Sequence, residues 1–271
     1  MATVADTRAT PLPAAGPLTA FVDRWIYVFM AGLIMAVVLT AFIPDAIGMV
    51  AGIKAGEVAP LTPILHVHAV LMGSWITLLL VQAWLMASGR RGWHMQLGLV
   101  AFGIAPAIFI AGMLLVPSRI GQYVAMAAAA SPQDAAELRA ALVPNSINIL
   151  LGQIRIGLAF PLLVGFALYL RTRDPETHKR LMVLATLSPL PAAIDRMWYL
   201  PSTLPGSPLS WELCVLLLAS PMLAWDLYHR RRLPRAYLIW FAVMIPTGIA
   251  MILLWNTPWW IAEGSKLLGV G

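Results

Sequence analysis

The sequence predicts an all-α integral membrane protein, a bundle of about seven transmembrane helices, and three observations support this fold class. Of its 271 residues, 60% are apolar and only 11% are charged, and the mean hydropathy is +0.81. A typical soluble domain is about half apolar and about a quarter charged. The apolar residues also form stretches long enough to cross a bilayer, and basic residues gather between these stretches.

A helix needs roughly 20 apolar residues to cross the hydrocarbon, where its backbone groups must be hydrogen-bonded internally. We expect prolines within the spans, such as Pro189, to kink their helices without ending them. The segment 117–146 is expected to be an outer loop carrying a short helix over Asp134–Ala141. Seven stretches meet the length requirement: residues 24–43, 64–88, 96–116, 147–170, 180–200, 210–228 and 236–256.

These spans divide the chain into three parts. Residues 1–23 are expected to form a disordered cytoplasmic lead. Residues 24–256 form the seven-helix transmembrane domain, in contact with the lipid bilayer, and residues 257–271 form a short outer tail.

The basic residues predict the direction of the chain. With the N-terminus in the cytoplasm, twelve Lys and Arg residues lie in inner segments and four in outer segments. Cytoplasmic loops carry such an excess of positive charge. The sequence therefore predicts a multi-pass protein of the bacterial inner membrane with a cytoplasmic N-terminus and an outer C-terminus. The net charge of +6 is explained by this orientation, so no nucleic-acid partner is expected.

Two basic hairpins of the sequence can be aligned. Placing His94 over His178 aligns residues 83–101 with residues 167–185 without gaps, with four identities in the 19 positions. Both hairpins have the same predicted orientation, so this pattern indicates a parallel repeat about an axis along the membrane normal. The alternative, that two such hairpins share only their composition, stays open.

The same two histidines suggest a cofactor. His94 and His178 open the third and fifth spans at equivalent depth, and two imidazoles facing each other across a bundle are what a six-coordinate haem b requires. Neighbouring cations, among them Arg91 and Lys179, would then pair with the haem propionates. The leading hypothesis is a haem-b-binding membrane protein in electron transfer or quinone-linked redox chemistry, with a quinone or a redox protein as partner. The alternative is two histidines at headgroup level without a cofactor.

Charged and polar residues within the spans suggest a second site. An ionised side chain within a span costs a few kcal/mol or more, so it normally forms an ion pair or lines a wet cavity. Arg155 and Asp195 both fall in the outer half, so we expect them to form an ion pair or to line an outer cavity. This cavity would bind a small or lipidic ligand or a metal, for transport, sensing or hydrolysis. Its expected lining is His66, His68, Gln82, Asn148, Arg155, Asp195 and Arg196.

His66 and His68 carry two further hypotheses. They form an HxH pair that would ligate a metal if the second span begins irregularly after Pro63. His68 would also ligate the haem if the cofactor lay on the outer side. His229, in the run YHRRRLPR, is expected to be solvated at the interface.

The string LHVHAVLMGSWITLLLVQAWLMASGRRGWHMQLG resembles a pattern in uncharacterised bacterial multi-pass membrane families. In that pattern a His opens one helix, a Gln lies late in it, and a His-x-x-x-Gly follows a basic turn; here these are His66 or His68, Gln82, and His94 with Gly98. The block HKRLMVLATLSPLPAAIDRMW resembles a second block of such proteins, so the resemblance covers residues 60–100 and 175–200. It implies the fold but no activity, and it differs from the cytochrome b561 type, which has two His on one helix at haem-to-haem spacing.

Several enzyme classes lack support in this sequence. It contains no GxSxG, Walker, HExxH or CxxC motif, and its only cysteine, Cys214, forms no internal disulfide. No catalytic residue is assigned, and whether the protein is an enzyme stays open. A non-catalytic subunit of a membrane complex is the third hypothesis.

Overall fold

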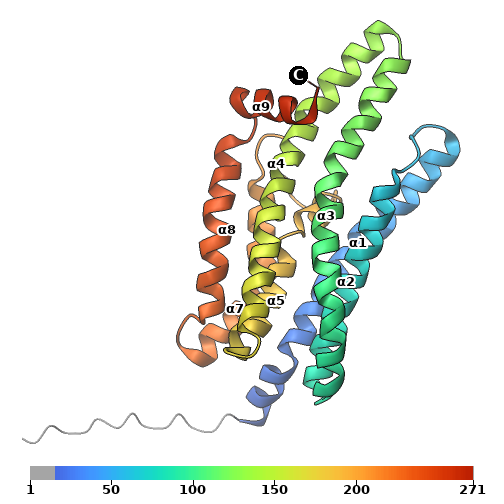
Figure 1. Ribbon diagram of the computed structural model, residues 1–271. Coiled ribbons are helices and arrows are strands. Elements are labelled where there is room, and N and C mark those ends of the chain that lie inside the picture. Colours follow the sequence, from blue (N-terminus) through green and yellow to red (C-terminus); the bar gives the residue numbers. More distant parts are fainter. Residues whose placement is uncertain (1–15, 271) are drawn as a thin grey trace, which may run out of the picture.

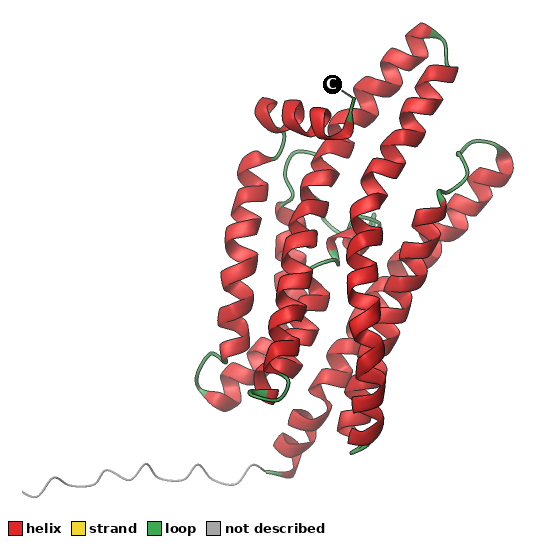
Figure 2. Ribbon diagram, in the orientation of Figure 1, coloured by secondary structure: helices red, strands yellow, loops and turns green. Residues whose placement is uncertain are grey.

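The computed structural model describes residues 16–270, apart from the side chains of residues 138–142, and within this range the chain forms nine helices and no strand (Figure 2). The long helices run roughly along one axis, and the short last helix lies across one end of the bundle (Figure 1). The helices are α1 (Pro17–Ala55), α2 (Pro63–Ala87), α3 (Arg91–Ala129), α4 (Pro132–Leu170), α5 (Pro175–Leu187), α6 (Pro191–Ile194), α7 (Leu209–Arg230), α8 (Arg235–Leu254) and α9 (Pro258–Leu268).

By length and composition, six helices of the described chain are able to cross a membrane: α1, α2, α3, α4 from Val143 onward, α7 and α8. Large apolar side chains such as Val70, Leu99 and Leu253 are about 70% exposed on the outside of the bundle. Exposing such an apolar surface to water costs free energy. Contact with lipid does not, because lipid chains are themselves apolar. The protein is therefore a multi-pass helical membrane protein in contact with lipid.

The two ends of the bundle differ in charge. At one end lie the turns 88–90, 171–174 and 231–234, which contain most of the arginines outside the helices; we call it the basic end. At the other end lie the α1–α2 loop, the α3–α4 turn and α9, and we call it the α9 end (Figure 1).

Several predicted boundaries are wrong. Helix α1 begins at Pro17, so residues 17–23 are helical and do not belong to a disordered lead; residues 1–15 lie outside the described range. No separate helix forms over 134–141, because α3 and α4 both extend to a tight turn at residues 130–131. Residues 258–268 are not a tail but a helix, and its Trp260 is buried and donates to the backbone oxygen of Ile147.

The expected continuous helix over 180–200 is also wrong, because α5 ends at Leu187. Pro189 and Pro191 both lack the N–H group that would continue the helical hydrogen bonds. The oxygen of Ala185, which would have accepted from residue 189, accepts instead from the buried hydroxyl of Ser188, at 2.6 Å, and from the backbone N–H of Ser188, at 3.2 Å. Pro189 therefore ends a helix, whereas Pro106 and Pro161 lie inside unbroken ones.

The fifth segment, which consists of α5 and the irregular part after the break, runs along the length of α8. Its start lies at the basic end, where Glu176 bonds to Arg230 at the end of α7. Its later part reaches the opposite end of α8, where the oxygen of Pro205 accepts from the indole of Trp255, at 2.9 Å. Helix α8 is 20 residues long, about 30 Å. Helix α5 covers about 20 Å of this length, and irregular backbone with the one-turn helix α6 covers the rest.

Candidate functional site

A cavity of about 200 Å³ lies at the α9 end of the bundle, where the broken segment meets α4, α7 and the end of α8. Three of the lining residues come from the irregular segment, two come from α4, and the other two are tryptophans. The lining residues are Asn145, Ile149, Asp195, Leu204, Pro205, Trp211 and Trp255.

Two asparagines fix the loop that closes this cavity. The amide of Asn148 on α4 donates to Oδ1 of Asn256, at 2.5 Å, and the backbone N–H of Asn256 donates to Oδ1 of Asn148. The Asn256 amide donates to the oxygen of Pro205, at 3.0 Å. Asn148 is buried and does not line the cavity. Its expected place in the lining is therefore wrong, and it acts as a support for the wall.

Asp195 and Arg196 are neighbours in sequence, but their side chains have different surroundings. The guanidinium of Arg196 bonds to Asp45 on α1, at 3.0 Å, and to the oxygen of Ala192. The carboxylate of Asp195 forms no hydrogen bond or ion pair with any described residue, and it lines the cavity. Arg196 is thus not part of the lining, and the cavity contains one carboxylate and no basic side chain.

Arg155 does not pair with Asp195, so that expectation is wrong. Its Nη2 donates instead to Oε2 of Glu212 on α7, at 2.7 Å, with side-chain exposures of 5% and 17%. Gly248 on α8 leaves room for the pair, since a Cβ there would lie 3.2 Å from Glu212 Oε2 and 3.4 Å from Arg155 Nη2. Arg155 Nε and Glu212 Oε1 are buried without a partner. The pair is therefore only partly satisfied.

His66, His68 and Gln82 do not line this cavity, which is a further correction. His66 is exposed, with its Nδ1 3.2 Å from the oxygen of Thr62. His68 instead faces α3 and α4: a Cβ on Gly112 would lie 3.5 Å from its ring and 3.0 Å from the amide of Gln153. Gln82 lies near the basic end, 3.7 Å from the Cβ position of Gly98. A regular helix directs residues two apart to nearly opposite sides, which explains why the two His rings separate.

The described residues provide no third metal ligand beside His66 and His68. Among residues 16–270, no group of three or more His, Cys, Asp or Glu side chains is arranged to hold a metal ion. A metal at His66 and His68 therefore remains a prediction from the sequence.

His94 and His178 come together at the basic end, close enough for their rings to interact electrostatically. The Nδ1 of His178 lies 2.8 Å from the oxygen of Ala167 on the preceding helix. His94 faces the backbone of Gln82, and its Nδ1 is buried without a partner. In both hairpins a His therefore reaches back to the helix before the turn, although α3 has 39 residues and α5 only 13.

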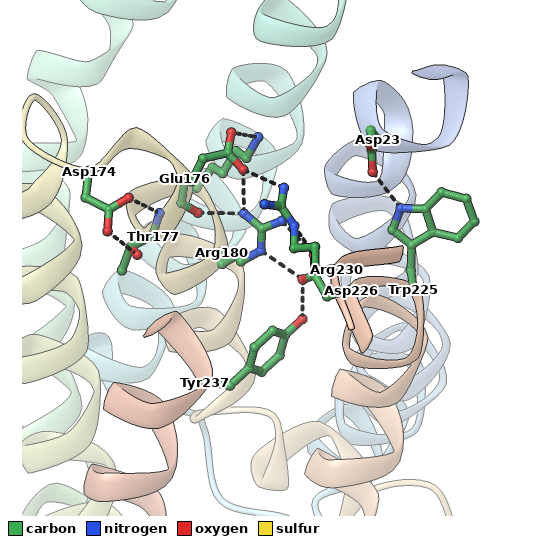
Figure 3. A network of polar contacts seen from close by, with 10 residues as sticks. Asp23, Asp174, Glu176, Thr177, Arg180, Trp225, Asp226, Arg230 and Tyr237 are labelled. Atoms are coloured by element: carbon green, nitrogen blue, oxygen red, sulfur yellow. Dashed lines mark hydrogen bonds and ion pairs between the residues drawn. The ribbon is translucent and has the colours of Figure 1, made fainter. Parts of the chain in front are cut away.

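The basic end also contains a network of charges that joins α5, α7 and α8 (Figure 3). Arg180 and Asp226 are both buried and form two hydrogen bonds, at 2.6 and 2.8 Å. The hydroxyl of Tyr237 donates to Asp226, at 2.9 Å, and Arg230 bonds to both Asp226 and Glu176. Arg180 also donates to the carboxylate and to the backbone oxygen of Glu176. All three nitrogen positions of the Arg180 guanidinium thus have partners.

Glu176 has an altered acidity in this network. Burial raises the pKa of its carboxyl group, but hydrogen bonds from Lys179 and Arg180 outweigh this effect and lower the pKa to about 2. Asp174, the N-cap of α5, accepts from the backbone N–H and hydroxyl of Thr177 and fixes the start of the helix that carries these residues (Figure 3).

The cations expected to bind haem propionates are largely engaged. Lys179 donates to Glu176, at 2.5 Å, and lies over the ring of Tyr27. Arg91 is exposed. His229 is not solvated as expected: its ring packs against Trp225, with centroids 3.9 Å apart, and its Nε2 is buried without a partner.

Glu212 and Asp226 were not identified from the sequence as functional or structural residues. Their positions in the sequence could have identified them, because both are acids inside the expected span 210–228. A charged residue is as unusual there as Arg155 is inside the span 147–170. Their partners could not be inferred, since these depend on which helices become neighbours.

None of the family models, characterised proteins or solved structures compared with this chain matches it. Its function must therefore be inferred from the residues themselves.

Proposed function

We propose that this protein binds a small ligand in the cavity at its α9 end and serves transport or sensing across the bacterial inner membrane. One observation carries the proposal: the irregular segment that follows α6 contributes Asp195, Leu204 and Pro205 to the lining of that cavity. Non-helical backbone at membrane depth is tolerated only where it is buried in protein or lines a wet cavity. In transporters, broken helices of this kind form the substrate site.

The proposal includes seven membrane crossings, with α5, α6 and the following loop as the fifth. The contacts of Glu176 near one end of α8 and of Pro205 at the other support this crossing. The excess of arginine at the basic end supports a cytoplasmic N-terminus and an outer C-terminus. The cavity then opens toward the outer side.

The orientation can be tested by cysteine labelling in a Cys214→Ala background. Glu57 and Thr172 are both exposed and lie at opposite ends of the bundle. Glu57→Cys should react with an impermeant thiol reagent in intact cells, and Thr172→Cys only after lysis. The opposite pattern would overturn the orientation.

The cavity itself is tested by filling it. Ile149 lines the cavity and is partly exposed, so Ile149→Trp adds an apolar ring there without burying a charge. A ligand that binds only the folded protein raises its melting temperature. We expect a screen of small metabolites to find compounds that stabilise the natural protein but not Ile149→Trp. Val70→Trp, on the lipid-facing surface, is the matched control and should respond as the natural protein does. Equal stabilisation of all three proteins would contradict the proposal.

A second candidate function is haem b binding at His94 and His178, for electron transfer to a quinone or a redox partner. The electrostatic interaction between the two rings, which places them near each other at the basic end, favours it. The bond from His178 Nδ1 to Ala167 leaves Nε2 as the free nitrogen, an arrangement typical of metal-ligating histidines. In this proposal the two imidazoles would supply the axial nitrogens, and the exposed Arg91 would be the cation for a propionate. Bound haem would supply one-electron chemistry.

The visible spectrum tests this second candidate. A Soret band should be lost in His94→Ala and in His178→Ala and retained in His229→Ala. A colourless protein purified from haem-replete cells in mild detergent would exclude it. Loss of colour through His68→Ala alone would instead place the cofactor on the outer side.

A further inference from the structure

The outer cavity is lined by a carboxylate that has no direct partner. Asp195 forms no hydrogen bond or ion pair with a described residue, and the guanidinium of the adjacent Arg196 bonds instead to Asp45 and to the oxygen of Ala192. None of the seven lining residues is basic. Arg155, six positions after Ile149 on α4, is itself paired with Glu212. Asp195 is therefore the only acidic or basic side chain among the seven lining residues.

The apolar part of the wall consists largely of indoles. Trp211 and Trp255 meet edge to face, with centroids 5.5 Å apart and rings at 86°. Trp211 is held at α4 because Gly152 has no side chain: a Cβ there would lie 3.1 Å from the ring. Trp255 is held by its bond to Pro205. Indole faces attract cations, and aromatic walls of this kind recognise alkylated ammonium groups.

The size of the cavity limits the ligand. A volume of about 200 Å³ is below the range of roughly 300–1,000 Å³ that is usual for drug-sized ligands. A hydrated metal cation would find one carboxylate and an amide but too few oxygen ligands. A small organic cation needs a single counter-ion and apolar contacts, and this cavity provides both.

We propose that the outer cavity binds a small organic ammonium ion, with Asp195 as its counter-ion and the indoles of Trp211 and Trp255 as its walls. This inference rests on the proposed ligand-binding function and names the chemical class of the ligand. The ammonium group comes either from a free solute or from the headgroup of a lipid in the outer leaflet. Asn145, at the same wall, supplies an amide for a polar substituent of the ligand.

The test measures equilibrium binding of radiolabelled tetramethylammonium to the full chain in a maltoside detergent at constant ionic strength. Asp195→Asn keeps the shape of the side chain and removes its charge, so we expect binding at least tenfold weaker. Glu57→Gln removes an exposed acid at the same end of the bundle and should bind as the natural protein does. The neutral near-isostere tert-butanol should not compete.

Measuring binding in two kinds of lipid bilayer distinguishes a free solute from a lipid headgroup as the source of the ammonium group. In bilayers of phosphocholine lipids, a headgroup that fills the cavity would weaken tetramethylammonium binding severalfold relative to bilayers of an uncharged galactolipid, which has no ammonium group and does not concentrate cations at its surface. Equal binding in both bilayers would assign the site to free solutes.

Two outcomes separate this proposal from the proposed function. If tetramethylammonium fails to bind, or binds Asp195→Asn equally well, the ammonium class is wrong. If the metabolite screen still finds ligands that Ile149→Trp excludes, the cavity remains a binding site for another class. If tetramethylammonium does not bind and the metabolite screen finds no ligand that Ile149→Trp excludes, the proposed ligand-binding function is wrong as well.

Discussion

The two groups of buried charges in this bundle differ in how completely their polar atoms are satisfied. At the basic end, Arg180 has partners for every nitrogen position, and both oxygens of Asp226 accept hydrogen bonds. In the core, Arg155 and Glu212 share one bond, and each retains a buried atom without a partner. A fully satisfied network rigidifies a structure, whereas a partly satisfied one retains unused capacity for hydrogen bonding.

This difference suggests different roles for the two regions. The Arg180–Asp226 network connects α5, α7 and α8 at the end where the turns are short, and its function is to hold the helices together. The Arg155–Glu212 pair lies close to Trp211, next to the cavity with the unpaired Asp195. Unsatisfied polar groups beside a cavity are sites where water or a ligand atom can bind.

The largest effect should come from breaking the satisfied network. Arg180→Leu leaves Asp226 buried with only Arg230 and Tyr237, and loss of one partner of a buried pair costs about 3–5 kcal/mol. The free energy of unfolding in detergent measures this loss. Lys266→Ala, which removes an exposed pair with Glu263, is the control and should cost about 0–1 kcal/mol. Similar losses in both variants would mean that the network does not stabilise the bundle.

The partly satisfied pair should be less important for stability. Arg155→Leu and Glu212→Leu should each cost about 1–3 kcal/mol, because polar contacts inside membrane bundles often measure weaker. The double variant should recover part of the summed loss, as expected for residues in contact. Asp195→Leu, in contrast, should add independently to Arg155→Leu. Coupling between Arg155 and Asp195 would restore the pairing that the sequence suggested.

Within the satisfied network, the hydroxyl of Tyr237 should contribute a smaller share. Tyr237→Phe removes one hydrogen bond to a charged group, an effect of about 1.5 kcal/mol. The aromatic ring stays in place, so packing is retained and the loss reports on the hydrogen bond alone. Tyr199→Phe, on the exposed surface, should leave the melting temperature unchanged. If the two variants behave alike, Asp226 is adequately satisfied without Tyr237.

The smallest effect is expected from the pH dependence of Glu176. Its pKa is lowered from 4.5 to about 2 in the folded protein, so its contribution to stability is complete above about pH 4.5 and is lost as the pH falls toward 2. The difference in melting temperature between the natural protein and Glu176→Gln should therefore shrink below pH 4.5. A difference that stays constant from pH 7 to pH 3 would show that the carboxylate is not held by Lys179 and Arg180.

The sequence by itself determined the class of the protein and most of its helices. Composition and apolar stretches identified the membrane bundle, because the length of a spanning helix is set by the bilayer and not by tertiary contacts. The spans at 64–88, 210–228 and 236–256 agree with α2, α7 and α8 to within two residues. The broken fifth segment was missed, because the sequence alone does not distinguish Pro189, after which the helix does not continue, from Pro106 and Pro161, which lie inside unbroken helices.

The pairing of the charges was decided by the tertiary structure alone. Arg155, Asp195, Glu212 and Asp226 can all be recognised as unusual in an apolar sequence, but a sequence does not show which helices become neighbours. Helix α7 packs so that Glu212 reaches Arg155, and Asp195 falls in the irregular segment, where it faces the cavity. The same packing directs His68 toward Gln153 and brings His94 to His178. Ion pairing inside a bundle depends on distances of a few ångströms, and these are fixed only when the helices pack.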